Sequence, residues 1–162
     1  EKAVLHEQAL LRVGQCQDQL GKWQDAEATF KKFIAAHPQH DHIRAAHHGL
    51  GGALKGQKKY PEALAEFELV VSKGIRDELG AQSQFLIGEC HLEQNKFSKA
   101  IAEYSKVELL YKSPVWQSKA IFEMAQALDK NGDKDSAKKQ YQRLIDKYPD
   151  TDAAKAAKTR LP

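Results

Sequence analysis

Long hydrophobic runs are missing from this sequence of 162 residues. The longest apolar stretches are a few residues long, far short of the roughly 20 that a membrane-spanning helix needs. No signal-peptide pattern stands at the start. Because the chain opens at Glu1 without an initiator methionine, we interpret it as a mature form or an excised piece. The sequence therefore predicts no membrane insertion and leaves the compartment open.

A concentrated block of one charge is also missing. The 25 basic and 22 acidic residues are interleaved along the whole chain, and the net charge is only +3. Nucleic-acid-binding domains usually show a basic patch or stripe. The charge pattern therefore argues against nucleic acid as a partner.

The alternation of apolar and polar residues that is typical of strands is not sustained anywhere. Apolar and small residues instead recur at spacings of three and four, as at Leu10, Val13 and Gly14, which is the periodicity of a helix. Turn signals such as Gly21, Pro61, and Ser113 with Pro114 separate these segments. The sequence predicts an all-α fold of eight helices, followed by a short ninth helix at about residues 152–160.

A unit of 37 residues repeats four times in register. One small residue marks each copy, with an aromatic ring four residues later and, in three copies, another three residues earlier. A second small residue lies twelve positions before the first. The first small residues are Ala26, Ala63, Ala100 and Ala137; the rings after them are Phe30, Phe67, Tyr104 and Tyr141; the rings before are Trp23, Tyr60 and Phe97; the second small residues are Gly14, Gly51, Gly88 and Ala125.

Glycine inside a helix costs roughly 1 kcal/mol relative to alanine, so its recurrence needs a compensating gain. We expect the small residues to mark places where two helices approach closely, with the rings packed into the next unit. Units of this kind bury both faces only in a stack. We therefore predict one solenoid domain over residues 1–162, with repeats at about 3–38, 41–74, 76–112 and 114–149 and a capping helix at 152–160.

The pattern resembles the tetratricopeptide repeat, which has small residues in both helices of a pair and often a closing proline, here Pro38 and Pro149. The resemblance implies an α-α superhelix that binds other proteins. We find no nucleophile with a base beside it, no phosphate-binding glycine loop and no pair of carboxylates in an enclosed pocket, so the sequence predicts neither an enzyme nor a cofactor. The long repeats and the phrase "DKYPDTDAAKAAKTRL" are also similar to bacterial cell-envelope members, BamD-like and TolA-binding Tol-Pal coordinator-like proteins. That likeness favours the bacterial periplasm, whereas unpaired cysteines favour a reducing compartment such as the cytoplasm.

In this family the first helices of the repeats line a concave groove that holds a peptide or helix of a partner. Carried over position by position, the resemblance implies a groove lined by Leu11, Gln15, Asp18, His48, Gly52, Lys55, Phe85, Glu89, Leu92, Phe122, Gln126 and Asp129. Some members grip a terminal carboxylate with polar groove residues. Leu11, Gln15, Gly52 and Gln82 stand where several of those residues are expected, so the resemblance does not imply an acidic tail as ligand.

Leu11, His48, Phe85 and Phe122 occupy the same place in successive repeats. A stripe of exposed apolar side chains often marks an interface. The alternative is that the rings pack between first helices as ordinary core. The sequence leaves both interpretations open.

Two further features have a structural and a functional interpretation. Five histidines lie between His37 and His48, and such a tract can collect a metal ion. Adjacent His47 and His48 point about 100° apart on a helix, so we interpret the tract as a polar turn between repeats.

Cys16 and Cys90 lie two repeats apart, too far to form a disulfide, and we expect both to be small buried side chains.

Three functions remain as hypotheses. The first is a scaffold that binds a protein segment in its groove. The second is self-assembly through terminal helices, because the first helix lacks a clear cap and suggests that repeats once preceded it. The third, metal binding through the histidine tract, has the least support.

Overall fold

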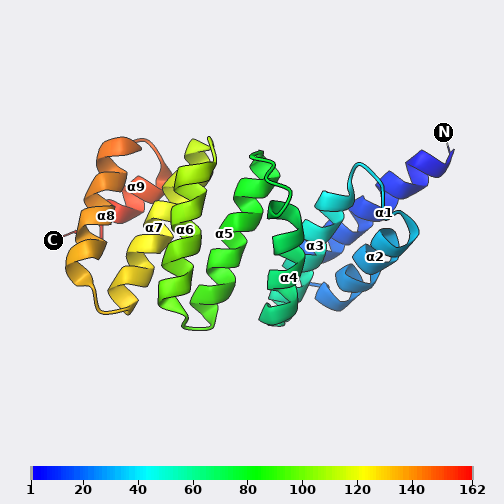
Figure 1. Ribbon diagram of the computed structural model, residues 1–162, viewed down its shortest axis with the longest axis horizontal. Coiled ribbons are helices and arrows are strands. Elements are labelled where there is room, and N and C mark those ends of the chain that lie inside the picture. Colours follow the sequence, from blue (N-terminus) through cyan, green and yellow to red (C-terminus); the bar gives the residue numbers. More distant parts are fainter. Residues whose placement is uncertain (1, 162) are drawn as a thin grey trace. The chain divides into compact units, whose positions relative to one another are not determined.

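The computed structural model describes residues 2–161 and the side chains of residues 8–161, and every regular element in that part of the chain is a helix (Figure 1). The predicted all-α class is confirmed. The helices are α1 (Lys2–Gln19), α2 (Trp23–Ala36), α3 (Ile43–Gly56), α4 (Tyr60–Val71), α5 (Glu78–Glu93), α6 (Phe97–Leu110), α7 (Pro114–Lys130), α8 (Lys134–Lys147) and α9 (Asp152–Lys158). Among the described residues, no helix has the length and apolar character needed to cross a membrane.

The chain divides into two compact units, Glu1–Lys73 and Gly74–Pro162. The first unit contains α1 to α4 and the second unit contains α5 to α9, and within each unit successive helices pack side by side. The boundary falls in the connector between the second and third predicted repeats. Each unit therefore holds two whole repeats, and the second unit also holds α9. The single domain predicted from the sequence stays a prediction.

The turn inside each repeat has the same backbone conformation. Four residues spaced 37 apart have a positive φ: Gly21 at 70°, Lys58 at 61°, Asn95 at 57° and Gly132 at 90°. Glycine and asparagine enter this left-handed region most readily, and lysine does so at a cost. The turn geometry thus recurs even where the residue type does not.

Local signals at the helix ends act as the sequence predicts. The Ser113 hydroxyl accepts a hydrogen bond from the backbone N–H of Trp116 at the start of α7, and Pro114 is the first helical residue. Pro61 lies in the first turn of α4. The last helix ends at Lys158 rather than at residue 160, because Thr159 and Arg160 form a closing turn.

The recurring glycines lie under aromatic rings. A Cβ atom added at Gly14 would be 2.8 Å from the Phe30 ring, and one at Gly51 would be 2.6 Å from the Phe67 ring. In the third repeat, a Cβ atom added at Gly88 would be 2.6 Å from the Tyr104 ring. The expected close approach is therefore present. The nearest partner of each glycine is the ring of its own repeat, because a ring is the larger group and fills the space that the missing side chain leaves.

Two rings of the first unit also reach the following repeat, as the sequence predicts. The ring of Phe30 covers Gly49 as well as Gly14, so it lies between α1 and α3. A Cβ atom at Gly56 would be 2.5 Å from the indole of Trp23. Gly49 and Gly56, which lie outside the 37-residue pattern, thus leave room for rings of the preceding repeat.

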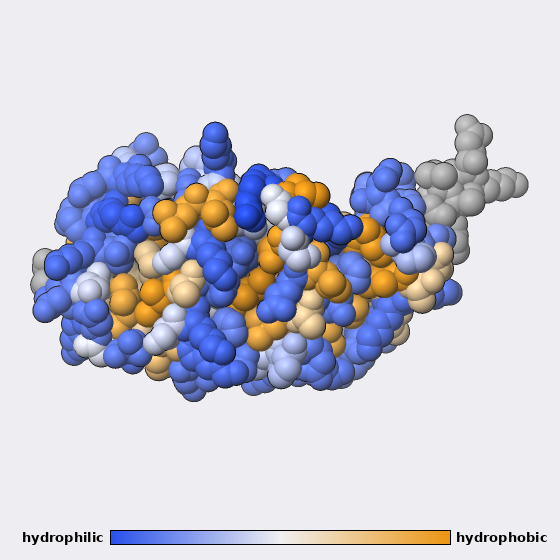
Figure 2. All heavy atoms as spheres, in the orientation of Figure 1, coloured by the Kyte–Doolittle hydropathy of each residue, from blue (hydrophilic) through white to orange (hydrophobic). Residues whose placement is uncertain are grey.

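The second unit is held together by two adjoining apolar clusters. The first joins α5, α6 and α7 through Phe85, Ala100, Tyr104, Val107, Ala120 and Met124. The second joins α7, α8 and α9 through Ile121, Ala125, Ala137, Tyr141, Leu144, Ala154 and Ala157. The short α9 contributes two fully buried alanines, which is the role of a cap. On the face drawn in Figure 2, apolar side chains show as strips between polar ones.

The expectation that Cys16 is buried is wrong. Cys16 is exposed although Cys90 is buried, and both thiols are free. Val13 on the same helix is 48% exposed, whereas its equivalent Leu50 is 3% exposed. This face of α3 packs against the second helix of the preceding repeat, but no helix precedes α1 among the described residues. The repeat positions of Val13 and Cys16 are therefore buried only where a preceding helix covers them.

Adjacent glycines in α3 test the ring contacts. Gly51→Ala places a methyl group against the Phe67 ring, and we expect it to lower the free energy of unfolding by about 1–3 kcal/mol. Gly52→Ala is the matched control, because its Cβ would be 3.6 Å from the Asp18 carboxylate, an ordinary contact. We expect the control to be neutral or stabilising by up to about 1 kcal/mol. Urea unfolding followed by circular dichroism measures both, and equal effects would contradict the proposed packing.

Candidate functional site

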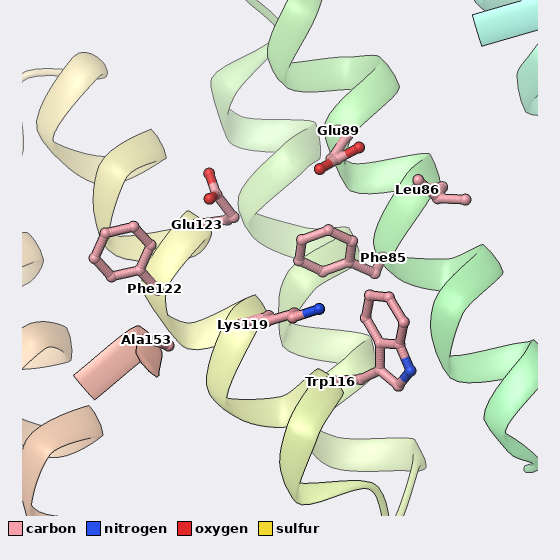
Figure 3. Close-up of a pocket in the computed structure, with 8 residues that line it drawn as sticks. All are labelled: Phe85, Leu86, Glu89, Trp116, Lys119, Phe122, Glu123 and Ala153. Atoms are coloured by element: carbon pink, nitrogen blue, oxygen red, sulfur yellow. The ribbon is translucent and has the colours of Figure 1, made fainter. Parts of the chain in front are cut away.

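The second unit carries a hollow of about 420 Å³ on the face of its first helices (Figure 3). We call it the second-unit hollow. Side chains from α5 and α7 form its sides, and α9 contributes one residue at its edge. Its lining residues are Phe85, Leu86, Glu89, Trp116, Lys119, Phe122, Glu123 and Ala153.

Aromatic rings form the walls of this hollow. The Phe85 ring lies 5.3 Å from the Trp116 ring and 5.4 Å from the Tyr104 ring, measured between centroids, and only 6% of Phe85 is exposed. Phe122 is half-buried and packs 5.7 Å from the ring of Tyr141. Phe85 is thus core and wall at once, whereas Phe122 presents part of its ring to the hollow.

The charged groups of the second-unit hollow are separated along its length. Glu89 and Glu123 lie at one end, and the amine of Lys119 lies at the other, with Phe85 between them (Figure 3). The Lys119 amine stands 4.5 Å from the centre of the Trp116 ring, a cation–π contact. Burial, together with the charge of Glu89, raises the pKa of Glu123 above its ordinary value, although Lys130 and a 3.0 Å hydrogen bond from Gln126 oppose this.

The first unit has a hollow of about 320 Å³ at equivalent repeat positions, which we call the first-unit hollow. It is lined by Gln8, Leu11, Arg12, Gln15, His42 and Ala45. Five of these six residues lie 74 residues, or two repeats, before a residue that lines the second-unit hollow: Leu11 before Phe85, Arg12 before Leu86, Gln15 before Glu89, His42 before Trp116 and Ala45 before Lys119. The same repeat geometry therefore opens the same face in both units.

The predicted groove residues are only partly brought together. Leu11 and Gln15 line the first-unit hollow, and Phe85, Glu89 and Phe122 line the second-unit hollow. The other predicted residues do not line either hollow, although His48, Gly52 and Gln126 share repeat positions with residues that do. Asp18 lies beside Gly52, and burial raises the pKa of Asp18 while the charge of Lys55 lowers it. Leu92 packs on the core, and Gln126 donates a hydrogen bond to Glu123. Asp129 borders a separate cavity with Tyr141.

Five lining residues of the second-unit hollow lie outside the predicted set: Leu86, Trp116, Lys119, Glu123 and Ala153. The prediction followed one stripe of each first helix and stopped at the position of Phe85 and Phe122. Lys119 lies three residues before Phe122, and Trp116 three residues before Lys119, so the same stripe continues toward the start of α7. Extending the stripe by two turns identifies both residues.

The histidine tract forms a packed turn between α2 and α3. The rings of His37 and His40 lie 5.2 Å and 5.5 Å from the ring of Phe33, and the Nδ1 atom of His40 accepts a hydrogen bond from the backbone N–H of His42. His47 pairs its Nδ1 with the Glu66 carboxylate at 2.6 Å. Where side chains are described, no three or more histidine, cysteine or acidic residues are grouped so that they could hold a metal ion.

His48, the predicted groove residue of the second repeat, packs 5.8 Å from the Phe67 ring, and burial lowers its pKa to about 4. The unfolded chain then binds more protons than the folded chain between pH 6.5 and 4, so stability falls as the pH falls. We expect a loss of about 2 kcal/mol from this histidine between pH 7.5 and 5. His48→Gln removes that part of the pH dependence, measured by urea unfolding at both pH values. Parallel pH profiles for the two proteins would contradict it.

Sequence profiles described as tetratricopeptide repeat match residues 8–40, 48–111 and 119–151, and no curated protein sequence matches the chain significantly. Three similar solved structures show the fold. A putative kinesin light chain with nearly identical TPR-like repeats from Podosopora anserina has a TM-score of 0.76 at 18% identity, covering 93% of this chain and 81% of that one. A tetratricopeptide repeat protein from Parabacteroides merdae has a TM-score of 0.76 at 15% identity, with coverages of 93% and 57%.

The third structure, MamA residues 41 to the end from Desulfovibrio magneticus RS-1, has a TM-score of 0.75 at 23% identity, with coverages of 90% and 77%. These neighbours confirm the predicted fold class, in which paired helices form a general protein–protein interaction scaffold and are generally not catalytic. The likeness to cell-envelope members stays a prediction. The ring-on-glycine packing, the 37-residue period and the profile matches all identify this chain as a member of the tetratricopeptide repeat family.

Proposed function

We propose that this chain is a binding scaffold that takes a peptide or helix of a partner protein on the face of its first helices. The observation that carries this proposal is the recurrence of a hollow at equivalent repeat positions in both units. A hollow that recurs with the repeat belongs to the architecture of the face. The two hollows also contain five of the groove residues that the family resemblance implies: Leu11, Gln15, Phe85, Glu89 and Phe122.

The walls of the second-unit hollow suit the side chains that anchor protein interfaces. Buried aromatic and large apolar side chains supply most of the binding energy at such interfaces, and they enter well-packed pockets. A hollow of about 420 Å³ has room for one or two such side chains between Phe122 and Trp116. The partly exposed ring of Phe122 gives an anchor a surface to pack against without first unfolding the core.

The test uses random dodecapeptides displayed on phage and selected on the full chain. We expect apolar peptides to be enriched and Phe122→Ala to weaken their binding by at least about tenfold, since truncating an anchor contact typically costs more than 1 kcal/mol. Phe85→Ala is less informative, because a ring that is 6% exposed is also core, and its loss costs about 3–5 kcal/mol of stability.

Leu109→Ala is the matched control, because Leu109 is 79% exposed in the same unit but lies outside the hollow. We expect this variant to keep the affinity of the parent chain. Circular dichroism confirms that both variants are folded. Failure to enrich any peptide, or equal binding by the Phe122→Ala variant, would contradict the proposed groove.

Self-association through a terminal helix is a second candidate, and one observation favours it. Val13 and Cys16 lie on the face of α1 that a preceding helix covers in the second repeat, and both are exposed. A second copy of the chain could bury that face. Under this candidate Val13→Glu abolishes concentration-dependent dimerisation in sedimentation velocity, and a parent chain that stays monomeric at high concentration would rule the candidate out.

A further inference from the structure

The two hollows share a position in the repeat and carry opposite charge. In the first-unit hollow the one formally charged lining residue is Arg12, and Gln8, Gln15 and His42 are polar. In the second-unit hollow Glu89 and Glu123 outnumber Lys119. Two repeats after Gln15 the chain has the acid Glu89, and two repeats after Arg12 it has the apolar Leu86. The repeat fixes the cavity, and the variable side chains give each cavity its own selectivity.

The Glu123 carboxylate of the second-unit hollow is placed where negative charge is costly. Burial and the charge of Glu89 both raise the pKa of Glu123, so the two acids repel one another in a partly desolvated place. The positive charge of Lys119 is held over the Trp116 ring at the opposite end of the hollow. A cation brought by an occupant to the acidic end would relieve this repulsion.

A buried hydroxyl lies near the same end. The Tyr104 side chain is fully buried, and its hydroxyl has no hydrogen-bond partner among the described residues. Burial, and then the charges of Glu123 and Glu89, raise the pKa of this phenol, which places it within electrostatic range of both acids. Buried polar groups are normally satisfied. The Tyr104 hydroxyl therefore has unused capacity for hydrogen bonding in this part of the second unit.

We propose that the second-unit hollow receives a cationic side chain, Arg or Lys, of a partner protein between Glu89 and Glu123, with a neighbouring apolar side chain packed against Phe122. This inference rests on the proposed function and names the chemistry of the occupant. Charge complementarity selects a basic and apolar segment and rejects an acidic one. The aromatic wall adds to the selection, because the cation of Lys119 already packs on Trp116 within the same hollow.

The experiment continues from the displayed dodecapeptides selected on the full chain. We expect an enriched pattern in which Arg or Lys lies within four residues of a large apolar residue. The selected peptide is then synthesised with its basic residue and with a neutral replacement, citrulline for arginine or norleucine for lysine. Binding is measured by the fluorescence of Trp116 in a Trp23→Phe background, because these are the two tryptophans of the chain.

Glu89→Gln combined with Glu123→Gln removes the charge and keeps the shape of the hollow. We expect this double variant to bind the basic peptide at least about tenfold more weakly at low salt, as expected when one partner of a close charge pair is lost. Its affinity for the neutral peptide should stay unchanged. Circular dichroism and urea unfolding establish that the double variant is folded, so that loss of binding is not explained by unfolding.

Asp135→Asn combined with Asp146→Asn is the matched control, because both acids are exposed on α8 and lie outside the hollow. We expect this variant to leave binding of the basic peptide unchanged. Three outcomes separate this inference from the proposed function. Basic peptides that lose affinity in the glutamine double variant support both. Neutral or acidic peptides that depend on Phe122 but not on the two glutamates support the groove and overturn the cationic occupant. The absence of any selected peptide overturns both.

Discussion

The packing of an aromatic ring on the bare backbone of a glycine is the contact on which the rest of this structure depends. A ring four residues after the buried alanine of a second helix covers the position where the first helix has no side chain, as Phe67 covers Gly51 and Tyr104 covers Gly88. The contact sets how closely the paired helices approach. It also sets which face of each first helix stays available, because the face bearing the glycine is used for packing.

The orientation of the first helices explains why the hollows recur. Once the glycine face is buried, the positions of Phe85, Glu89 and their equivalents turn toward the open side of the unit. The hollow forms between the first helices of successive repeats, with side chains of α5 and α7 in the second unit and of α1 and α3 in the first. Cavity and charge are therefore controlled by different residues, and the charge can change without disturbing the packing.

The repeat, the helix order, the ring contacts with the next repeat and the capping residues at Ser113 and Pro114 could all be predicted from the sequence, because each depends on local chemistry repeated at a fixed interval. The candidate site was predicted less completely. Phe85, Glu89 and Phe122 follow from repeat position, but Trp116 and Lys119 lie two turns and one turn before Phe122, beyond the stripe that was considered. The exposure of Cys16 could not be predicted from its position alone, since burial there depends on a preceding helix rather than on the residue itself.

The ring of Phe30 has two glycine contacts, Gly14 in its own repeat and Gly49 in the following one. When either helix detaches, the ring loses one of its two covered surfaces, so the two repeats are energetically coupled through a single side chain. A change in the size of that ring must be matched at two sites, 16 and 19 residues away in opposite directions along the chain. Duplication of one 37-residue segment copies the ring without copying both of its partners, and the growth of such an array is thereby constrained at each new junction.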